Sequence, residues 1–372
     1  MKKFVLQFPS RQISCDVIIE RSVLRKLARI LKKNNYSRNY ILLTDGIVKE
    51  LYGKSLQKAI RREKLQCHLI SVLPGERSKS RKVKERIEDI ILRKGHSRDS
   101  ILIALGGGVV GDLGGFVAST FLRGIPFIQI PTTLISMADS SLGGKTAVNH
   151  PMGKNLIGAF HQPLAIFIDV RTLTTLPERD YRAGMAEVIK YGVILDRSLF
   201  SFIEKNQESL KKREYQVLER VVEKCVRLKA RIVRMDEREE NIRKILNCGH
   251  TIGHSVEHLS SYRLLHGEAV SIGLAVESSI SHIMGYMNKP SLERIRNTLQ
   301  AFDLPIRFPK TIQARDILKV AERDKKTSQG QIKYALPATI GVAVDEKEAA
   351  IPVSRRIVMR AIQDCSHTKS LR

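Results

Sequence analysis

The chain has 372 residues, of which 42% are apolar and 27% charged, and it contains no Trp. At about 150 residues per domain this length predicts two domains, and the composition excludes a disordered chain and a fibrous protein. The 64 Lys and Arg residues exceed the 38 Asp and Glu residues, which gives a formal charge of +26. This charge raises the question of whether the protein binds acidic ligands. Basic residues are spread over the whole chain and aromatics make up only 5%, which argues against specific nucleic-acid binding.

The cysteines and the apolar runs indicate the cellular compartment in which the protein works. The five cysteines lie far apart and form no CxxC pair, which predicts a reducing cytoplasm and no disulfide scaffold. The opening MKKFVLQFPSRQIS lacks the apolar run of a signal peptide. The most apolar stretch, 101–122, is interrupted by Asp112 and carries six glycines, so it does not resemble a membrane span. We therefore expect a cytoplasmic protein that does not bind a membrane.

Short β-branched runs alternate with amphipathic segments in the first half of the chain. Strands buried on both faces are predicted at 40–44, 67–73, 100–105, 127–130 and 165–169. Helices are predicted at 22–33, 47–64 and 78–94. This alternation predicts a parallel sheet with crossover helices, an α/β Rossmann-like domain over 1–177.

After Pro177 the pattern changes to long helical segments with charge pairs at three- and four-residue spacing, as at 187–194 and 214–238. We expect a mainly α-helical second domain over 178–372, with the active site in the cleft between the two domains. Within it, 331–344 predicts two short strands around a Pro-containing turn.

A glycine-rich run follows the predicted strand at 100–105 and fits G-x-G-x-x-G at Gly106, Gly108 and Gly111. Glycines let the backbone approach a pyrophosphate, and the following helix offers free N–H groups and a positive dipole. The alternative is a tight turn without a ligand, since no acidic residue lies about 20 positions further on. Polar turns at 44–45 and, with Lys79, at 74–76 favour the dinucleotide.

A second group of residues suits an anionic ligand. Arg123, Lys145, Lys154 and Asn155 supply cationic and amide donors that recognise phosphate or carboxylate. Two glycines before Lys145 suggest that a ligand approaches closely there. The alternative is a solvated basic face on a very basic protein.

Histidines gather in one stretch of the second half. His250, His254 and His258 are spaced four apart and would share one helix face, whereas His266 starts a new segment. Upstream, Glu187 supplies a carboxylate. Two histidines with a carboxylate predict a catalytic metal of the zinc type. The spacing leaves open whether His250 or His254 is the ligand, and we expect His258 on the helix surface.

These motifs together resemble the 3-dehydroquinate synthase family. The runs GGGVVGDLGGFVAS, FLRGI, IPTTLISMADSSLGGKTAVNHPMGKNLIGAF, MAEVIKYG and LNCGHTIGHSVEH with HGEAV occur in the family's order, over about 44–337. The resemblance implies cyclisation of 3-deoxy-D-arabino-heptulosonate 7-phosphate to 3-dehydroquinate with loss of phosphate, in the shikimate pathway to aromatic amino acids. It also implies bound NAD, a divalent metal (zinc or cobalt) and a homodimer.

The resemblance also implies roles for individual residues. The metal ligands it implies are Glu187, His250 and His266. Catalytic positions are Lys145, Lys190, Lys229, Arg243, Asn247 and His254, the last near the substrate phosphate. Substrate-binding positions are Asn155, Asp139 between cofactor and substrate, Arg123 reaching into the partner's site, and one of Lys325 and Lys326. Cofactor positions are Asp45, Glu76, Lys79, Gly106, Gly107, Gly108, Asp112, Thr132, Thr133, Lys145, Lys154 and Thr175.

Two other enzymes remain as alternatives. Another sugar-phosphate cyclase would share nearly every motif, and the sequence offers no discriminator against it. A metal-dependent polyol dehydrogenase of the same fold would share the glycine loop and the metal. It differs in stoichiometry, because a dehydrogenase consumes NAD, whereas the synthase releases phosphate with no net redox change.

Overall fold

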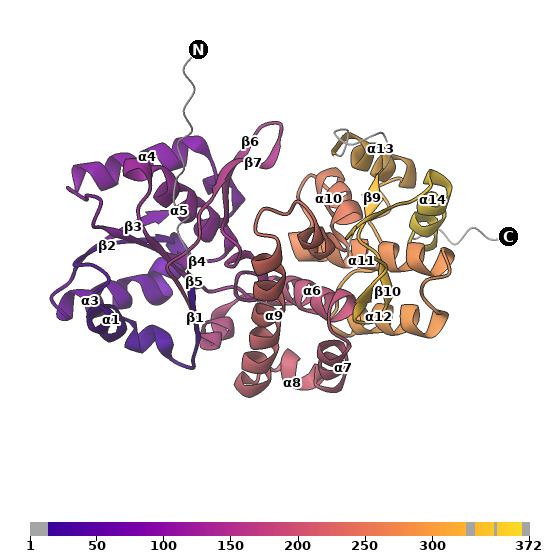
Figure 1. The fold of residues 1–372 in the computed structure, drawn as a ribbon, viewed down its shortest axis with the longest axis horizontal. Coiled ribbons are helices and arrows are strands. Elements are labelled where there is room, and N and C mark those ends of the chain that lie inside the picture. The colour runs from indigo at the N-terminus through magenta and orange to yellow at the C-terminus, as the bar shows by residue number, and fades with distance from the viewer. Residues whose placement is uncertain (1–13, 325–331, 346–347, 367–372) are drawn as a thin grey trace, which may run out of the picture.

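The computed structural model describes residues 14–324, 332–345 and 348–366 (Figure 1). Lys325 and Lys326, the two candidates for one substrate contact, lie outside these residues. The first half of the chain forms an α/β unit around one sheet, and the second half is mainly helical, as the sequence predicted.

The sheet has six strands, all parallel, in the order β1-β8-β5-β4-β2-β3. They are β1 (Asp16–Ile19), β2 (Asn39–Asp45), β3 (Gln66–Val72), β4 (Ile101–Gly106), β5 (Phe127–Pro131) and β8 (Ala165–Ile168). All five predicted strands are confirmed to within a residue or two. The edge strand β1 was missed, because it has only four residues, none of them fully buried, and its apolar run is only three residues long.

Helices cover both faces of the sheet because its strands are apolar on both sides. In β2, Tyr40 and Leu42 pack into the cluster that contains α1 (Val23–Asn34) and α3 (Lys54–Arg62). Ile41 and Leu43 pack on the other face, whose cluster contains residues of α4 (Arg81–Arg93) and α5 (Gly108–Thr120). Figure 1 shows these two layers on opposite sides of the strands. The predicted helix 47–64 is interrupted: α2 (Gly46–Val48) and a π-helical turn (Lys49–Gly53) precede α3.

A hairpin that the sequence analysis did not predict lies between β5 and β8. Its strands, β6 (Lys145–His150) and β7 (Gly153–Phe160), pair with each other and stand apart from the main sheet (Figure 1). It carries three predicted ligand-binding residues, Lys145, Lys154 and Asn155.

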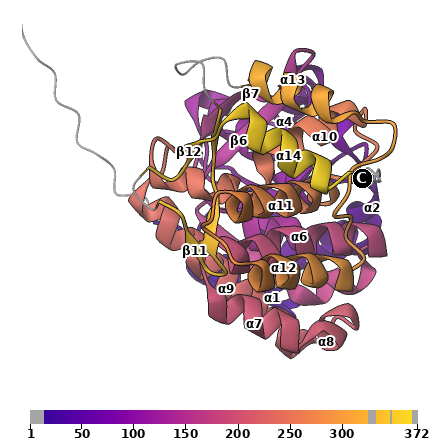
Figure 2. The ribbon, with the colours of Figure 1, turned by 90° about the vertical axis from the view of Figure 1, so that its right-hand side faces the viewer.

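The helical half begins directly after Pro177. Figure 2 shows α6, α11 and α12 side by side across this half. Its helices are α6 (Glu178–Ile194), α7 (Arg197–Lys205), α8 (Gln207–Lys211), α9 (Tyr215–Met235), α10 (His250–Leu259), α11 (His266–Ile283), α12 (Lys289–Ala301), α13 (Ala314–Asp324) and α14 (Arg355–Asp364).

The short strands at the end of the chain differ from the prediction. The sequence suggested one pair of strands around a Pro-containing turn, and this was wrong. Pro337 lies inside β10 (Pro337–Thr339), which pairs with β11 (Val342–Ala343). The turn between them contains Gly341, whose φ of 87° favours glycine. The other strand, β9 (Lys333–Tyr334), pairs with the distant β12 (Ile351–Pro352), a partner that local patterning does not reveal.

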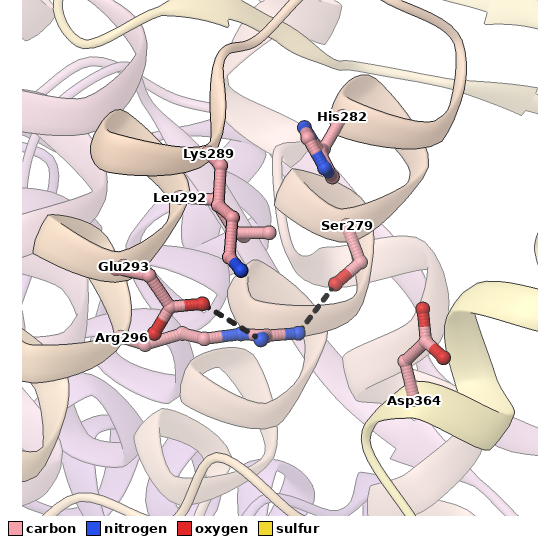
Figure 3. Close-up of a pocket in the computed structure, with 7 residues that line it drawn as sticks. All are labelled: Ser279, His282, Lys289, Leu292, Glu293, Arg296 and Asp364. Carbon is pink, nitrogen blue, oxygen red and sulfur yellow. Dashed lines mark hydrogen bonds and ion pairs between the residues drawn. The ribbon is translucent and has the colours of Figure 1, made fainter.

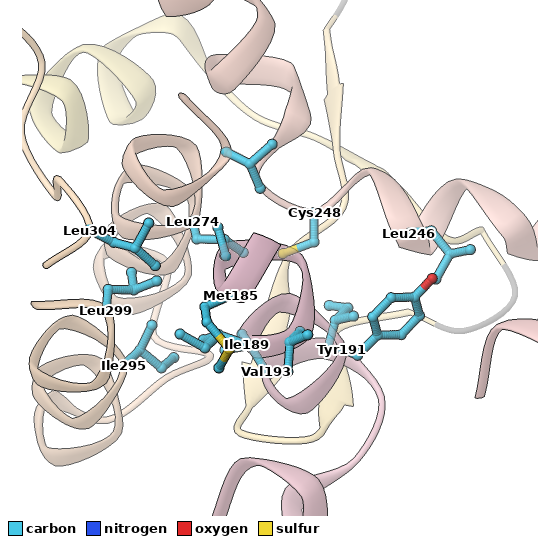
Figure 4. Packing of buried hydrophobic residues seen from close by; sticks show 14 of the residues in the cluster. Met185, Ile189, Tyr191, Val193, Leu246, Cys248, Leu274, Ile295, Leu299 and Leu304 are labelled. Carbon is cyan, nitrogen blue, oxygen red and sulfur yellow. The ribbon is translucent and has the colours of Figure 1, made fainter. Parts of the chain in front are cut away.

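Two glycines bring the helices of this half into close contact. A Cβ at Gly267 would lie 1.9 Å from the carbonyl oxygen of Ala183 in α6, and a Cβ at Gly273 would lie 1.8 Å from that of Gly249, just before α10. Any side chain there would force α11 away from α6 or α10. Around them, Met185, Leu274 and other buried apolar side chains form a continuous core (Figure 4). The result is that α6, α10 and α11 meet.

We predict that Gly273→Ala destabilises the protein by about 1–3 kcal/mol or more, because the new methyl group overlaps a backbone carbonyl. The measurement is the free energy of unfolding in urea. Gly46→Ala is the control, since its Cβ would meet Pro74 at an ordinary 3.8 Å. Equal stabilities for the two variants would contradict the close approach of α11 to the turn before α10.

Candidate active site

The predicted cofactor residues collect at the carboxyl ends of the central strands. The chain leaves β2 toward β3 at one edge of the sheet, and leaves β4 toward β5 in the opposite direction. Dinucleotides bind at such a switch point in parallel sheets. Asp45 ends β2 and accepts hydrogen bonds from the backbone N–H groups of Ile47 and Val48, at 2.9 and 3.0 Å. The N–H of Thr132, after β5, donates to the carbonyl of Gly106 at 2.9 Å.

The glycine loop leads directly into α5. Gly107 is the residue before the helix and Gly108 its first residue. A Cβ on Gly107 would lie 2.9 Å from Thr133, so glycine keeps the space beside that threonine open. The hydroxyl of Thr175, at the end of the 3-10 turn that follows β8, lies 2.6 Å from the hydroxyl of Tyr52 in the π-helical turn before α3. The start of α5 has no side-chain cap, so its first N–H groups are open to a ligand, as a pyrophosphate site requires.

Lys79 ties the glycine-loop helix to the hairpin. Its buried ammonium donates to Asp112 of α5 and to Asn155 of β7, at 2.5 Å in each case. Burial raises the pKa of Asp112, although Lys79 opposes that shift. Glu76 lies nearby and accepts a hydrogen bond from Asn149 at 2.7 Å. The structure therefore brings predicted cofactor residues and the predicted substrate residue Asn155 into one network.

The metal-ligand candidates meet where α6, α10 and α11 converge. The Glu187 side chain is only 1% exposed, and its Oε1 lies 3.3 Å from Nε2 of His250 and 3.3 Å from Nε2 of His266. Its Oε2 lies 2.6 Å from the ammonium of Lys190. Burial opposes ionisation of Glu187, but Lys190 and His250 hold its pKa well below the ordinary value. Burial likewise opposes the charged form of His266, yet its two carboxylate neighbours raise its pKa to about 9.

This geometry fits a metal ion. Tetrahedral zinc has bonds of about 2.0–2.1 Å to nitrogen and oxygen, so its ligand atoms lie about 3.3–3.4 Å apart. The two distances from the Glu187 oxygen match that separation. One carboxylate and two imidazoles also form the donor set of an open catalytic site.

His254 lies at the edge of the same cluster. Ring nitrogens of His250, His254 and His266 lie within 4.8 Å of one another, but His254 is exposed. The imidazoles of His250 and His266 both contact Glu187. His258 is exposed on α10 beside Tyr262, a surface position as expected.

A second buried charge pair lies beside the metal-ligand candidates. Asp139 Oδ1 accepts hydrogen bonds from Lys229 at 2.8 Å and from the Tyr191 hydroxyl at 2.5 Å. Burial opposes its ionisation, but Lys229 and Lys190 hold the pKa of Asp139 below its ordinary value. Burial lowers the pKa of Lys229, and Asp139 partly offsets this. These contacts join the loop after β5 to α6 and α9.

A carboxylate that the sequence analysis missed joins two predicted catalytic residues. Glu239 pairs with the ammonium of Lys145 and accepts a hydrogen bond from Asn247 at 2.8 Å. It lies in the acidic run DEREE between α9 and the turn before α10. A run of this kind is typical of a solvated loop, so only the fold, which brings Lys145 from 94 residues away, identifies it.

The two glycines before Lys145 are approached by the chain's own side chains. Both terminal nitrogens of the buried Arg243 donate to the carbonyl of Gly143 at 3.2 Å, and the φ of Gly143 is 91°. A Cβ on Gly144 would lie 2.7 Å from Gln162. The sequence suggested the approach of a ligand, whereas the close contacts at these two glycines in this structure come from Arg243 and Gln162.

Arg123 lies beyond the other end of α5 from the glycine loop. It is exposed at the end of a short 3-10 turn after α5 and has a φ of 68°.

A cavity of about 280 Å³ lies in the helical half, lined by residues such as Ser279, Lys289 and Arg296 (Figure 3). None of the predicted site residues lines it.

Family models match most of the chain. The description "3-dehydroquinate synthase N-terminal" matches residues 69–183, and "3-dehydroquinate synthase C-terminal" matches residues 184–327. The chain belongs to the 3-dehydroquinate synthase family. It is 43% identical over 358 residues to the 3-dehydroquinate synthase of Prochlorococcus marinus (strain MIT 9312), covering 94% of this chain and 98% of that protein. It is 43% identical to that of Thermodesulfovibrio yellowstonii, covering 92% and 95%.

A solved structure within this family of folds is also similar. The 2-epi-5-epi-valiolone synthase ValA of Streptomyces hygroscopicus subsp. jinggangensis 5008, solved with NAD+ and Zn2+ bound, superimposes with a TM-score of 0.88. It is 28% identical, and the match covers 97% of this chain and 99% of that one. Among the described residues, no helix is both long enough and apolar enough to cross a membrane.

We predict that Lys229→Met destabilises the protein by about 2–3 kcal/mol, because it leaves Asp139 without its closest cation. The loss is smaller than for a fully buried pair, since 21% of the Asp139 side chain is exposed. Unfolding in denaturant measures it. In Asp139→Asn/Lys229→Met both charges are gone, so part of the stability returns. Losses that simply add, to within about 0.5 kcal/mol, would show that the two side chains are not coupled.

Proposed function

We propose that this chain converts 3-deoxy-D-arabino-heptulosonate 7-phosphate to 3-dehydroquinate and inorganic phosphate, as its family does. One carbinol carbon is oxidised transiently, phosphate is eliminated, the carbon is reduced again, and ring opening and an intramolecular aldol addition close the carbocycle. The observation that carries the proposal is the buried Glu187 carboxylate with two imidazoles 3.3 Å from one of its oxygens.

The residues that would hold the cofactors lie at the two ends of the site. Glu187, His250 and His266 would bind zinc or cobalt, and the carboxyl ends of β2 and β4 with the start of α5 would bind NAD. When bound, the metal polarises neighbouring substrate hydroxyls and NAD is a reversible hydride acceptor. We infer that the active site lies in a cleft between domains 1–177 and 178–372.

The lysines divide into two kinds by exposure. The Lys145 side chain is 48% exposed and pairs with Glu239, so its ammonium can turn to a substrate phosphate or carboxylate. Lys190 and Lys229 are 1% and 6% exposed and pair with Glu187 and Asp139. They keep these carboxylates ionised beside the substrate. We infer that charge-assisted positioning by these groups contributes most to phosphate elimination.

We also infer a homodimer in which Arg123 completes the partner's site. Its side chain is exposed, its backbone has a left-handed φ of 68°, and it lies beyond the end of α5 that is opposite the glycine loop. A reducing cytoplasm, inferred from the sequence, agrees with five free cysteines.

The choice between the two cyclase activities follows sequence identity. The chain is 43% identical to a 3-dehydroquinate synthase and 28% identical to the valiolone synthase, which favours 3-dehydroquinate synthase activity.

We predict that purified protein with a catalytic amount of NAD releases phosphate from the heptulosonate phosphate, and that a chelator abolishes the release. Added Zn2+ or Co2+ should restore it, because the carboxylate and imidazole ligands stay in place. Phosphate and NADH are measured together. NADH that accumulates in step with substrate consumption would instead support a polyol dehydrogenase. Release from other sugar phosphates only would support another cyclase.

Mixing two inactive variants tests the shared site. Arg123→Ala should inactivate the partner's site, and Glu187→Gln its own site. Hybrid dimers then keep one intact site of two, so an equal mixture should regain about a quarter of wild-type activity, since half of the dimers are hybrids. Phosphate release after subunit exchange measures this. A mixture as inactive as its components would mean that Arg123 does not act across the interface.

A further inference from the structure

Glu257 of α10 lies between the metal-ligand candidates and the hairpin. Its side chain is only 6% exposed. Oε2 lies 3.2 Å from Nδ1 of His266, and Oε1 lies 2.5 Å from the ammonium of Lys154 on β7. One carboxylate therefore contacts an imidazole of the helical half and a cation of the α/β half.

The contact with His266 determines which ring nitrogen is available. Nε2 of His266 faces Glu187, and Nδ1 faces Glu257. A carboxylate accepts a hydrogen bond, so when Nε2 of His266 binds a metal ion through its lone pair, the proton of the neutral ring lies on Nδ1 and is donated to Glu257. His250 has the same arrangement, with Nδ1 3.2 Å from the carbonyl of Cys248 and Nε2 toward Glu187. Histidines that bind metals depend on such partners for ring orientation and basicity.

The contact with Lys154 holds the hairpin against the helical half. The ammonium lies 4.4 Å from the ring centre of Tyr262, besides its contact with Glu257. Tyr262 follows the end of α10, so one lysine is held by a carboxylate and an aromatic face from the same helical segment. An amine placed over an aromatic ring is attracted to it, and the Glu257 contact is largely shielded from water.

We propose that Glu257 is a positioning residue for the metal centre, which holds His266 with Nε2 toward the ion and at the same time anchors the hairpin through Lys154. The proposal rests on the proposed function, since it requires a metal at Glu187, His250 and His266. Glu257 does not touch the ion; it acts through His266. Docking of the hairpin and orientation of one ligand thereby depend on the same carboxylate.

The test measures metal binding without NAD or substrate. The dissociation constants for Zn2+ and Co2+ are determined by competition with a chromophoric chelator, and the visible spectrum of the Co2+ form reports ligand geometry. We expect Glu257→Gln to weaken binding about 10–100-fold and Glu257→Asp to weaken it less, since the carboxylate is kept. The matched control is Glu204→Gln, which removes a carboxylate from an ion pair with Arg294 at 2.5 Å, away from the site.

Hydrogen exchange tests the second half of the proposal. Glu257→Gln and Lys154→Met should raise amide exchange in the hairpin, 145–160, to similar extents, and Glu204→Gln should not. Metal affinity of Glu257→Gln and Glu257→Asp within twofold of wild type would overturn the positioning role. Unchanged exchange in Glu257→Gln would overturn the anchoring role. A wild-type protein that binds neither ion would overturn the proposed function itself, and this inference with it.

Discussion

The negative charge of Glu187 constrains the whole helical half. An ionised carboxylate without partners is costly to remove from water, and this side chain is 1% exposed. Lys190, one turn further along the same helix, supplies part of the compensation at 2.6 Å. The remainder comes from His250 and His266, which belong to two other helices. The charge is therefore balanced only when α10 and α11 both start against α6, and this is the arrangement that a metal ion needs.

The arrangement has a steric requirement and an electrostatic one. Gly267 and Gly273 satisfy the first, because only glycine lets α11 approach the backbones of Ala183 and Gly249 so closely. The second extends beyond Glu187. Lys190 also lowers the pKa of Asp139, which Lys229 holds from α9. Cationic side chains and carboxylates thus alternate from the loop after β5 to α11. Loss of any one of these groups leaves the charge of a neighbouring group without its partner.

The sequence predicted what depends on local periodicity and missed what depends on distant partners. Residues 40–43 alternate between the two faces of the sheet, so the apolar run alone identified a central strand. The hairpin has no such signal, since β7 exposes Leu156 and Phe160 and pairs with β6 outside the main sheet. Spacing found the histidine cluster but could not separate His250 from His254, which stand one turn apart on α10. What the structure adds is that His250 contacts Glu187, more than 60 positions upstream on α6, and that His254 is exposed.

Segment 137–162 makes contacts that help to join the two halves, and these contacts differ in burial along the segment. At its start, Met137, Ala138 and Leu142 belong to the apolar core of the helical half, and Asp139 is held by Lys229. Further on, Lys154 pairs with Glu257, whose side chain is only 6% exposed, and Lys145, whose side chain is 48% exposed, pairs with Glu239. Exposed ion pairs stabilise little, so the Lys145–Glu239 contact can be exchanged for another at low cost. An anionic ligand competes with Glu239 for Lys145 by the same charge-assisted hydrogen bonds. The hairpin is therefore the part of the fold where protein carboxylates and ligand anions can replace one another, while the buried start of the segment keeps the two halves in register.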